Sequence, residues 1–206
     1  MHEAGNILEI ANMRPDFMGF IFHDSSPRDI SYIADTLPLK QIPKSINKVL
    51  VVVNKPLEHV LQLVDKYDFD LVQLHGAESP DYCMLMSEKV SVIKVFPVWD
   101  ALPADLKHYD GVCDYFLFDS KGDKAGGNGI AFPHEILKTY PLGKPFFLSG
   151  GLTPEHAHLI PHMQLPHLYG VDINSRFEAQ PGLKDTELVK CFKDKLDNPY
   201  AQHSEQ

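Results

Sequence analysis

The chain has 206 residues, of which 44% are hydrophobic and 23% are charged. At about 150 residues per domain, this length predicts one domain, which we place at residues 1–197, with a polar tail over residues 198–206. The net charge is −9, which argues against a nucleic-acid binder because phosphate backbones need a basic face. A single local pocket can still bind a small anion.

The cysteines and the amino-terminal segment indicate the compartment. Cys83, Cys113 and Cys191 form no Cys-x-x-Cys pair, and their odd number favours a reducing compartment over a disulfide framework. No apolar run approaches the roughly 18 residues of a membrane span. Residues 1–6 have neither the basic nor the apolar region of a secretory signal. We therefore expect a cytoplasmic protein that does not cross a membrane.

Short apolar runs alternate with amphipathic segments along the chain. The runs are rich in β-branched and aromatic residues, and most lack polar alternation, which is typical of strands buried on both faces of a parallel sheet. They cover residues 17–22, 49–54, 70–75, 92–98, 115–119, 145–150 and 168–174. Their ends lie 21 to 32 residues apart, which is enough for a strand and its crossover helix.

The segments between these runs are predicted as helices. Leu57, Val60, Leu61 and Val64 follow Pro56 at helical spacing. Ser79 and Thr153 each precede a proline and an acidic residue, as capping residues do, and further helices are predicted at residues 7–11 and 186–196. Seven strand–helix units favour an α/β fold of the (β/α)8 TIM-barrel type over an open sheet. Because the chain starts with a helix, we expect the first of the eight strands to be missing.

Polar residues stand where such a barrel would have its active site, at the carboxyl ends of the strands. Asp119 ends an apolar run and is a candidate general acid, although a helix cap or a partner for Lys121 would also explain it. Arg28 lies beyond the first run and is a candidate for binding a carboxylate through two hydrogen bonds. The alternative for Arg28 is a solvated loop residue.

Two loops are candidates for a phosphate site. Gly150 and Gly151 separate a strand from a helix start, and Asn174 and Ser175 follow the next strand. Glycines let backbone N–H groups approach a phosphate, and the loops after the last two strands of TIM barrels often bind one. We therefore predict a phosphorylated small molecule as the ligand, with a plain tight turn as the alternative for the glycine pair.

The sequence offers no convincing metal site. His156, His158 and His162 share a predicted helix, and the last two have the i, i+4 spacing of zinc ligands, but no third ligand is evident. The Lys- and Gly-rich stretch 121–130 is either a mobile lid over the site or a connection without a role.

Taken together, these residues resemble the phosphoribosylanthranilate isomerase family of tryptophan biosynthesis. The matching motifs recur in order over about residues 5–195. They are Gly-Phe-Ile-Phe at 19–22, Ser-Pro-Arg at 26–28, Val-Gln-Leu-His-Gly at 72–76 with Glu78, Phe-Asp at 118–119, Gly-Gly-x-Gly at 126–129, Ser-Gly-Gly-Leu-x-Pro at 149–154, Gly-Val-Asp at 170–172 and Glu-x-x-Pro-Gly-x-Lys-Asp at 178–185.

The resemblance implies an Amadori rearrangement. N-(5-phosphoribosyl)anthranilate would become 1-(o-carboxyphenylamino)-1-deoxyribulose 5-phosphate, without a metal or redox cofactor. Asp119 would be the general acid, Arg28 would bind the anthranilate carboxylate, and His75 would line the aromatic part of the site. The substrate-binding residues implied in this way are Arg28, His75, Gly150, Gly151, Asp172, Asn174 and Ser175.

Two departures from the family bear on activity. The family begins with a strand that ends in Lys-[Val/Ile]-Cys-Gly-Met, whose cysteine is the general base, and Met1 aligns with that methionine. We therefore expect impaired activity, since losing a general base costs about 10²–10⁴-fold. The family usually has Ser-Ser-Gly where this chain has Asn174-Ser175-Arg176, which predicts a different phosphate loop or an added contact from Arg176.

Two other functions remain open from the sequence. One is a catalytically inactive barrel that binds a phosphorylated ligand or a partner protein. The other is a different phosphosugar enzyme, either an epimerase, which needs metal ligands at several strand ends, or an indole-glycerol-phosphate synthase, for which Lys94 would have to point inward. In each case we expect a monomer or a homodimer.

Overall fold

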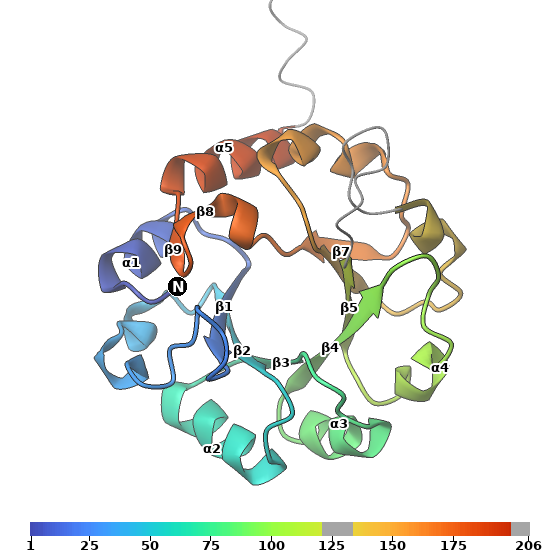
Figure 1. Cartoon of the computed structure of the whole chain (residues 1–206), viewed down its shortest axis with the longest axis horizontal. Helices are drawn as coiled ribbons and strands as arrows, with labels where there is room; N and C mark the ends of the chain where they lie inside the picture. Colours follow the sequence, from blue (N-terminus) through green and yellow to red (C-terminus); the bar gives the residue numbers. More distant parts are fainter. Residues whose placement is uncertain (121–133, 199–206) are drawn as a thin grey trace, which may run out of the picture.

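The computed structural model describes residues 1–120 and 134–198. Within them, seven parallel strands form one sheet in chain order. The sheet curls around a central axis, with helices on its outside (Figure 1). The strands are β1 (Phe17–Phe22), β2 (Asn47–Val52), β3 (Leu71–Leu74), β4 (Ser91–Val98), β5 (Tyr115–Ser120), β6 (Phe146–Ser149) and β7 (Leu168–Val171). All seven predicted strands are confirmed.

Helices connect the strands. The α-helices are α1 (Ala4–Asn12), α2 (Leu57–Tyr67), α3 (Pro80–Ser87), α4 (Leu106–Tyr109) and α5 (Thr186–Asp197). As predicted, Ser79 caps α3, its hydroxyl accepting the Tyr82 N–H at 3.2 Å. Short 3-10 helices are η1 (Ala34–Thr36), η2 (Leu39–Gln41), η3 (His134–Thr139), η4 (Pro154–His158), η5 (Ile160–His162) and η6 (Ser175–Phe177). No helix of the described residues is long and apolar enough to cross a membrane.

The segment after β6 differs from the sequence prediction. Instead of one α-helix that begins after Thr153, the chain forms the two 3-10 helices η4 and η5. Pro161 accounts for the interruption, because it has no N–H to donate and its ring blocks an α-helical turn. His158 and His162 therefore lie on different segments, and the α-helical spacing behind the zinc hypothesis does not exist. The described residues contain no cluster of potential metal ligands.

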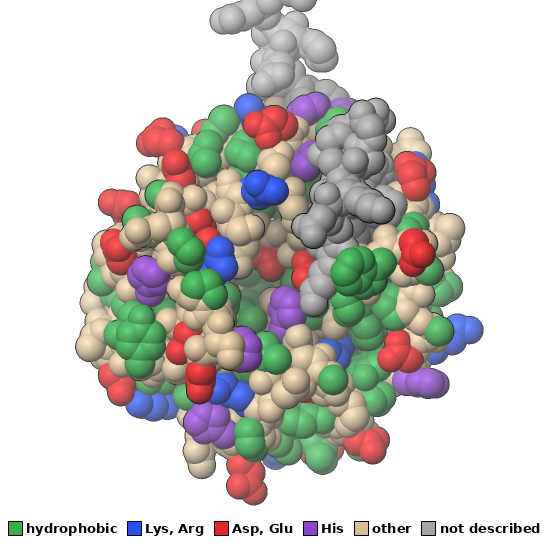
Figure 2. Space-filling view, in the orientation of Figure 1, with side chains coloured by type: hydrophobic (Ala, Val, Ile, Leu, Met, Phe, Trp, Pro, Cys, Tyr) green, Lys and Arg blue, Asp and Glu red, His purple; other side chains and the backbone are tan. Residues whose placement is uncertain are grey.

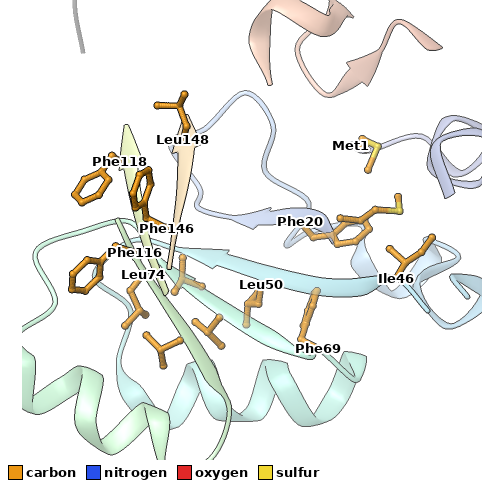
Figure 3. Packing of buried hydrophobic residues seen from close by; sticks show 14 of the residues in the cluster. Met1, Phe20, Ile46, Leu50, Phe69, Leu74, Phe116, Phe118, Phe146 and Leu148 are labelled. Atoms are coloured by element: carbon orange, nitrogen blue, oxygen red, sulfur yellow. The ribbon is translucent and has the colours of Figure 1, made fainter. Parts of the chain in front are cut away.

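Both faces of the sheet are buried, which explains why the strands lack polar alternation. Inside the ring, one face contributes Val49, Val51, Leu71, Ile93, Val95, Leu117 and Phe147. The other face packs against the helices through residues such as Phe20, Leu50, Leu74, Phe116 and Leu148 (Figure 3). Alternate side chains point to opposite faces of a strand, so each strand supplies both cores.

β1 and β7 are the outer strands in the sheet order, and neither has a second strand neighbour among the described residues. Aromatic side chains bridge them inside the ring, since the Phe17 ring centroid lies 6.2 Å from that of Tyr169. On the same side, α1 meets the antiparallel hairpin of β8 (Glu178–Gln180) and β9 (Leu183–Lys184) (Figure 1). Asn6 exchanges two hydrogen bonds with the Lys184 backbone, at 2.9 and 2.8 Å.

Lys94 does not point into the ring, which corrects the orientation that an indole-glycerol-phosphate synthase would require. It alternates with the inward-facing Ile93 and Val95, and its side chain is 4% exposed. Its ammonium lies 3.3 Å from the Glu78 carboxylate and donates to the Gly76 carbonyl at 2.8 Å. Glu78 also accepts the Gly76 N–H, at 3.0 Å. This buried pair therefore fixes the backbone next to His75.

Replacing Lys94 with methionine tests how far the fold depends on this pair. Lys94→Met leaves the Glu78 charge buried without its cation, so the free energy of unfolding should fall by about 3–5 kcal/mol. Urea unfolding measures this, with Lys66→Met as the control, because Lys66 pairs with Asp35 on the surface and should matter far less. Adding Glu78→Gln to Lys94→Met should recover part of the loss. Equal losses in the two lysine variants would contradict the assignment.

Candidate active site

The carboxyl ends of the strands meet at one rim of the ring. Figure 2 shows a hollow at its centre, with acidic, basic and histidine side chains around it. Asp119 is two residues beyond the inward-facing Leu117 on β5, and His75 has the same parity as the inward-facing Leu71 on β3. Side chains alternate along strands, so Asp119 and His75 both face the axis of the ring.

Asp119 and His75 lie next to each other in this hollow. The His75 Nε2 atom is 3.7 Å from Asp119 Oδ2, and the two side chains are 36% and 18% exposed. Gln73 holds the far side of the imidazole, with its Nε2 atom 3.2 Å from His75 Nδ1. An amide NH2 group can only donate, so this contact favours the His75 tautomer in which Nδ1 accepts and Nε2, the atom that faces Asp119, carries the proton.

Asp172 is the second carboxylate of the hollow. It follows β7, its N–H donates to the Leu148 carbonyl at 2.8 Å, and the Ser149 hydroxyl donates to its Oδ2 at 3.5 Å. Burial raises the pKa of Asp172, and the charge of Asp119 raises this pKa further. Two carboxylates of different environments therefore share the hollow with His75, an arrangement suited to acid–base chemistry.

The two predicted phosphate loops lie beyond β6 and β7. Gly150 and Gly151 have φ angles of +90° and +62°, a conformation that glycine adopts without steric cost. Asn174 precedes η6 and Ser175 begins it, and both are exposed. Arg176 lies within η6 with an ordinary negative φ, so the loop does not need the family's glycine there.

Arg28 is not a solvated loop residue. Its Nε atom donates to both oxygens of Glu178, at 3.0 and 2.8 Å, and its Nη2 atom donates to one of them at 2.6 Å. Lys184 donates to the same carboxylate at 3.1 Å. The sequence contains Glu178 and Lys184 in a motif, but nothing in the local pattern assigned them to the site. A glutamate and a lysine close together in a short turn-forming stretch, Pro181-Gly182, were the available signal.

The remaining predicted features lie elsewhere. Cys83 is buried in α3, Cys113 is buried before β5, and Cys191 is exposed on α5, so none is at the rim. His156 accepts the Thr153 N–H at 2.9 Å on Nδ1 and thereby caps η4. The glycine-rich stretch at 126–129 and the tail beyond residue 198 lie outside the described residues.

The raised pKa of Asp172 predicts a pH-dependent effect on stability. An acid whose pKa is higher in the folded protein than in the unfolded chain opposes folding once it is ionised. Asp172→Asn should therefore raise the free energy of unfolding at pH 7, and the gain should shrink as the pH falls toward the ordinary aspartate value of 3.8. Urea unfolding at several pH values measures this, with Asp194→Asn as an exposed control. A gain that does not change with pH would contradict the assignment.

Comparison with known proteins identifies relatives of this chain. Residues 1–195 match the family model described as N-(5'phosphoribosyl)anthranilate (PRA) isomerase. The N-(5'-phosphoribosyl)anthranilate isomerase of Parabacteroides distasonis is 38% identical over 211 residues, which cover 98% of this chain and 93% of the relative. The isomerase of Phocaeicola vulgatus is 38% identical over 200 residues, which cover 95% and 94%.

Solved structures of such isomerases share the fold. The phosphoribosyl anthranilate isomerase of Thermotoga maritima has a TM-score of 0.81 at 28% identity, covering 96% of this chain and 95% of its own. An isomerase in complex with reduced 1-(o-carboxyphenylamino)-1-deoxyribulose 5-phosphate has a TM-score of 0.79 at 26% identity, with the same coverage. From the family model, the relatives and the fold, the chain belongs to the N-(5'-phosphoribosyl)anthranilate isomerase family, whose members are isomerases of tryptophan biosynthesis.

Proposed function

We propose that the hollow at the rim is the active site for an Amadori rearrangement of N-(5-phosphoribosyl)anthranilate. The reaction needs an acid that protonates the ribose ring oxygen, so that the ring opens to an iminium. A base must then remove the C2′ proton, which gives an enolamine that tautomerises to the ketose. The observation that carries the proposal is the position of Asp119 in the hollow, 3.7 Å from His75 and near the half-buried Asp172, on which its charge acts.

Asp119 is the proposed general acid. It stands at the end of β5, where the register pairs it with Pro97 on β4 and Ser149 on β6, so rigid strands hold it on both sides. The His75 Nε2 atom lies 3.7 Å from Asp119 Oδ2, so the imidazole borders the place where the proton is proposed to be transferred. The imidazole face is the proposed wall of the aromatic part of the site.

The two ends of the substrate carry anions, and each has a proposed binding group. Arg28 would bind the anthranilate carboxylate, because a guanidinium matches a carboxylate with parallel hydrogen bonds. The backbone at Gly150 and Gly151, together with Asn174 and Ser175, would bind the phosphate, because loops rich in N–H donors favour anions. Asp172 follows β7 two residues before Asn174, and it is close enough to Asp119 for the charge of that carboxylate to act on it.

We also propose that the ring is that of a (β/α)8 barrel and that this 206-residue chain turns its substrate over slowly. β1 and β7 each lack a second strand neighbour among the described residues, and an eighth parallel strand paired with both would close the barrel. The resemblance implies a cysteine as the general base of the family, and none of the three cysteines of this chain lies at the rim. The chain would therefore lack this base. One relative is described as monomers generated from a dimeric enzyme, and for this chain we propose either a monomer or a homodimer.

A side-by-side assay tests the function and the missing base together. The loss of phosphoribosylanthranilate fluorescence is followed with the chain as given, and with the chain preceded by a strand that ends in Lys-Val-Cys-Gly. The extended chain should turn over at least about 10²-fold faster, and the same extension with serine for cysteine should lose that gain. Equal rates for all three proteins would contradict the proposal that the chain lacks its general base. No turnover in any, although all fold, would contradict the isomerase proposal.

Removing the proposed acid gives a second prediction. In the extended chain, Asp119→Asn should lower kcat by about 10²–10⁴-fold, while affinity for the reduced product analogue should change little, because the acid acts on the transition state. Steady-state kinetics and calorimetric titration measure the two quantities, with Asp100→Asn as the control at the same rim. A variant that keeps its kcat would remove Asp119 from the mechanism.

A further inference from the structure

Glu178 is a buried carboxylate that the mechanism above does not use. Its side chain is 3% exposed, and it begins β8, directly after η6. The Glu-x-x-Pro-Gly-x-Lys-Asp motif at residues 178–185 contains it, together with Lys184. Glu178 binds one neighbour in this motif, Lys184, and one distant side chain, since Arg28 is 150 positions away in the sequence.

Lys184 extends this network to the proposed phosphate loop. An ammonium has three N–H donors, and Lys184 directs them to Glu178 Oε1 at 3.1 Å, to the Asn174 carbonyl at 3.1 Å and to Asn174 Oδ1 at 2.7 Å. One carboxylate thus links Arg28 to the loop that follows β7.

The hairpin that carries these groups is itself held in place. Asn6 binds both backbone groups of Lys184, and the His2 N–H donates to the Gly182 carbonyl at 3.1 Å. Gly182 has a φ of +83°, and a Cβ atom there would collide with the His2 ring. The hairpin is therefore anchored at its turn and along β9, the strand that pairs with the one carrying Glu178.

The charges in this network favour an anionic ligand. Burial opposes the ionisation of Glu178, but the hydrogen bond from Arg28 and the charge of Lys184 outweigh it, so its pKa lies below the ordinary value. One carboxylate between two cations leaves one net positive charge. Arg28 uses Nε and Nη2 for Glu178, so a ligand carboxylate would meet the Nη1 side of the guanidinium.

We propose that Glu178 is a positioning residue that aligns both anion-binding ends of the site. It orients the Arg28 guanidinium directly, and it orients the Asn174 loop through Lys184. This inference rests on the proposed function, because it takes the carboxylate and the phosphate of the substrate as the two anions. Glu178 does not contact the substrate in this role.

The test compares Glu178→Gln with the unaltered chain and with Glu9→Gln, an exposed control on α1. Calorimetric titration measures binding of reduced 1-(o-carboxyphenylamino)-1-deoxyribulose 5-phosphate, and competition measures anthranilate and inorganic phosphate separately. Glutamine has the same shape but no charge, so affinity for the analogue should fall by about tenfold or more, since charge-assisted hydrogen bonds are lost. Both fragments should bind more weakly, and Glu9→Gln should bind normally.

Two further variants separate positioning from a general loss of structure. Lys184→Gln breaks the link to the Asn174 loop, so phosphate binding should weaken while anthranilate affinity stays within about twofold. Arg28→Lys should give the opposite pattern. These two variants decide the question even if Glu178→Gln does not fold, because a network with only a structural role would weaken both fragments equally in each variant.

The outcomes distinguish this inference from the proposed function. If the unaltered chain does not bind the analogue, both are overturned. If it binds and Glu178→Gln binds as tightly or more tightly, the site stands but Glu178 competes with the ligand carboxylate for Arg28 and does not position it.

Discussion

Every strand pair in the sheet is parallel, and the site depends on that constraint. Parallel strands bring all their carboxyl ends to one rim, and the curl of the sheet turns that rim into a ring around the hollow (Figure 1). The alternation of side chains then decides which residues face it. Leu71 and Leu117 fill the inside of the ring, and the residues of the same parity at the strand ends, His75 and Asp119, project into the hollow.

Two buried carboxylates hold the rim in shape from different sides. Glu78 pairs with Lys94 on the outer face and fixes the backbone beside His75. Glu178 pairs with Arg28 and Lys184 where the outer strands β1 and β7 face each other. The side chains of both glutamates are almost fully buried, and both are matched by cations, as buried charges must be. His75 and Asp119, the residues proposed for acid–base chemistry and for the aromatic wall of the site, are more exposed than these two glutamates.

The strands and the position of Asp119 at a strand end were predictable because their signals are local. Buried strands appear as apolar runs, and Asp119 appears at the end of one. The α-helix expected after Thr153 is replaced by two 3-10 helices because Pro161 interrupts it. The prediction relied on the capping residues at the start of the segment and did not take this proline into account. The direction of Lys94 depends on a register that only the folded sheet defines. The Glu178 network was missed for another reason, since Arg28 and Glu178 are 150 residues apart and no local pattern connects them.

The most direct measurement is a crystal structure of the chain with reduced 1-(o-carboxyphenylamino)-1-deoxyribulose 5-phosphate bound. The account predicts that the analogue lies in the hollow, with its carboxylate on Arg28 and its phosphate between the turn at Gly150 and Gly151 and the loop at Asn174 and Ser175. The carbon chain between these ends should pass Asp119. An analogue bound outside the hollow, or one with its phosphate on Arg28, would contradict the account.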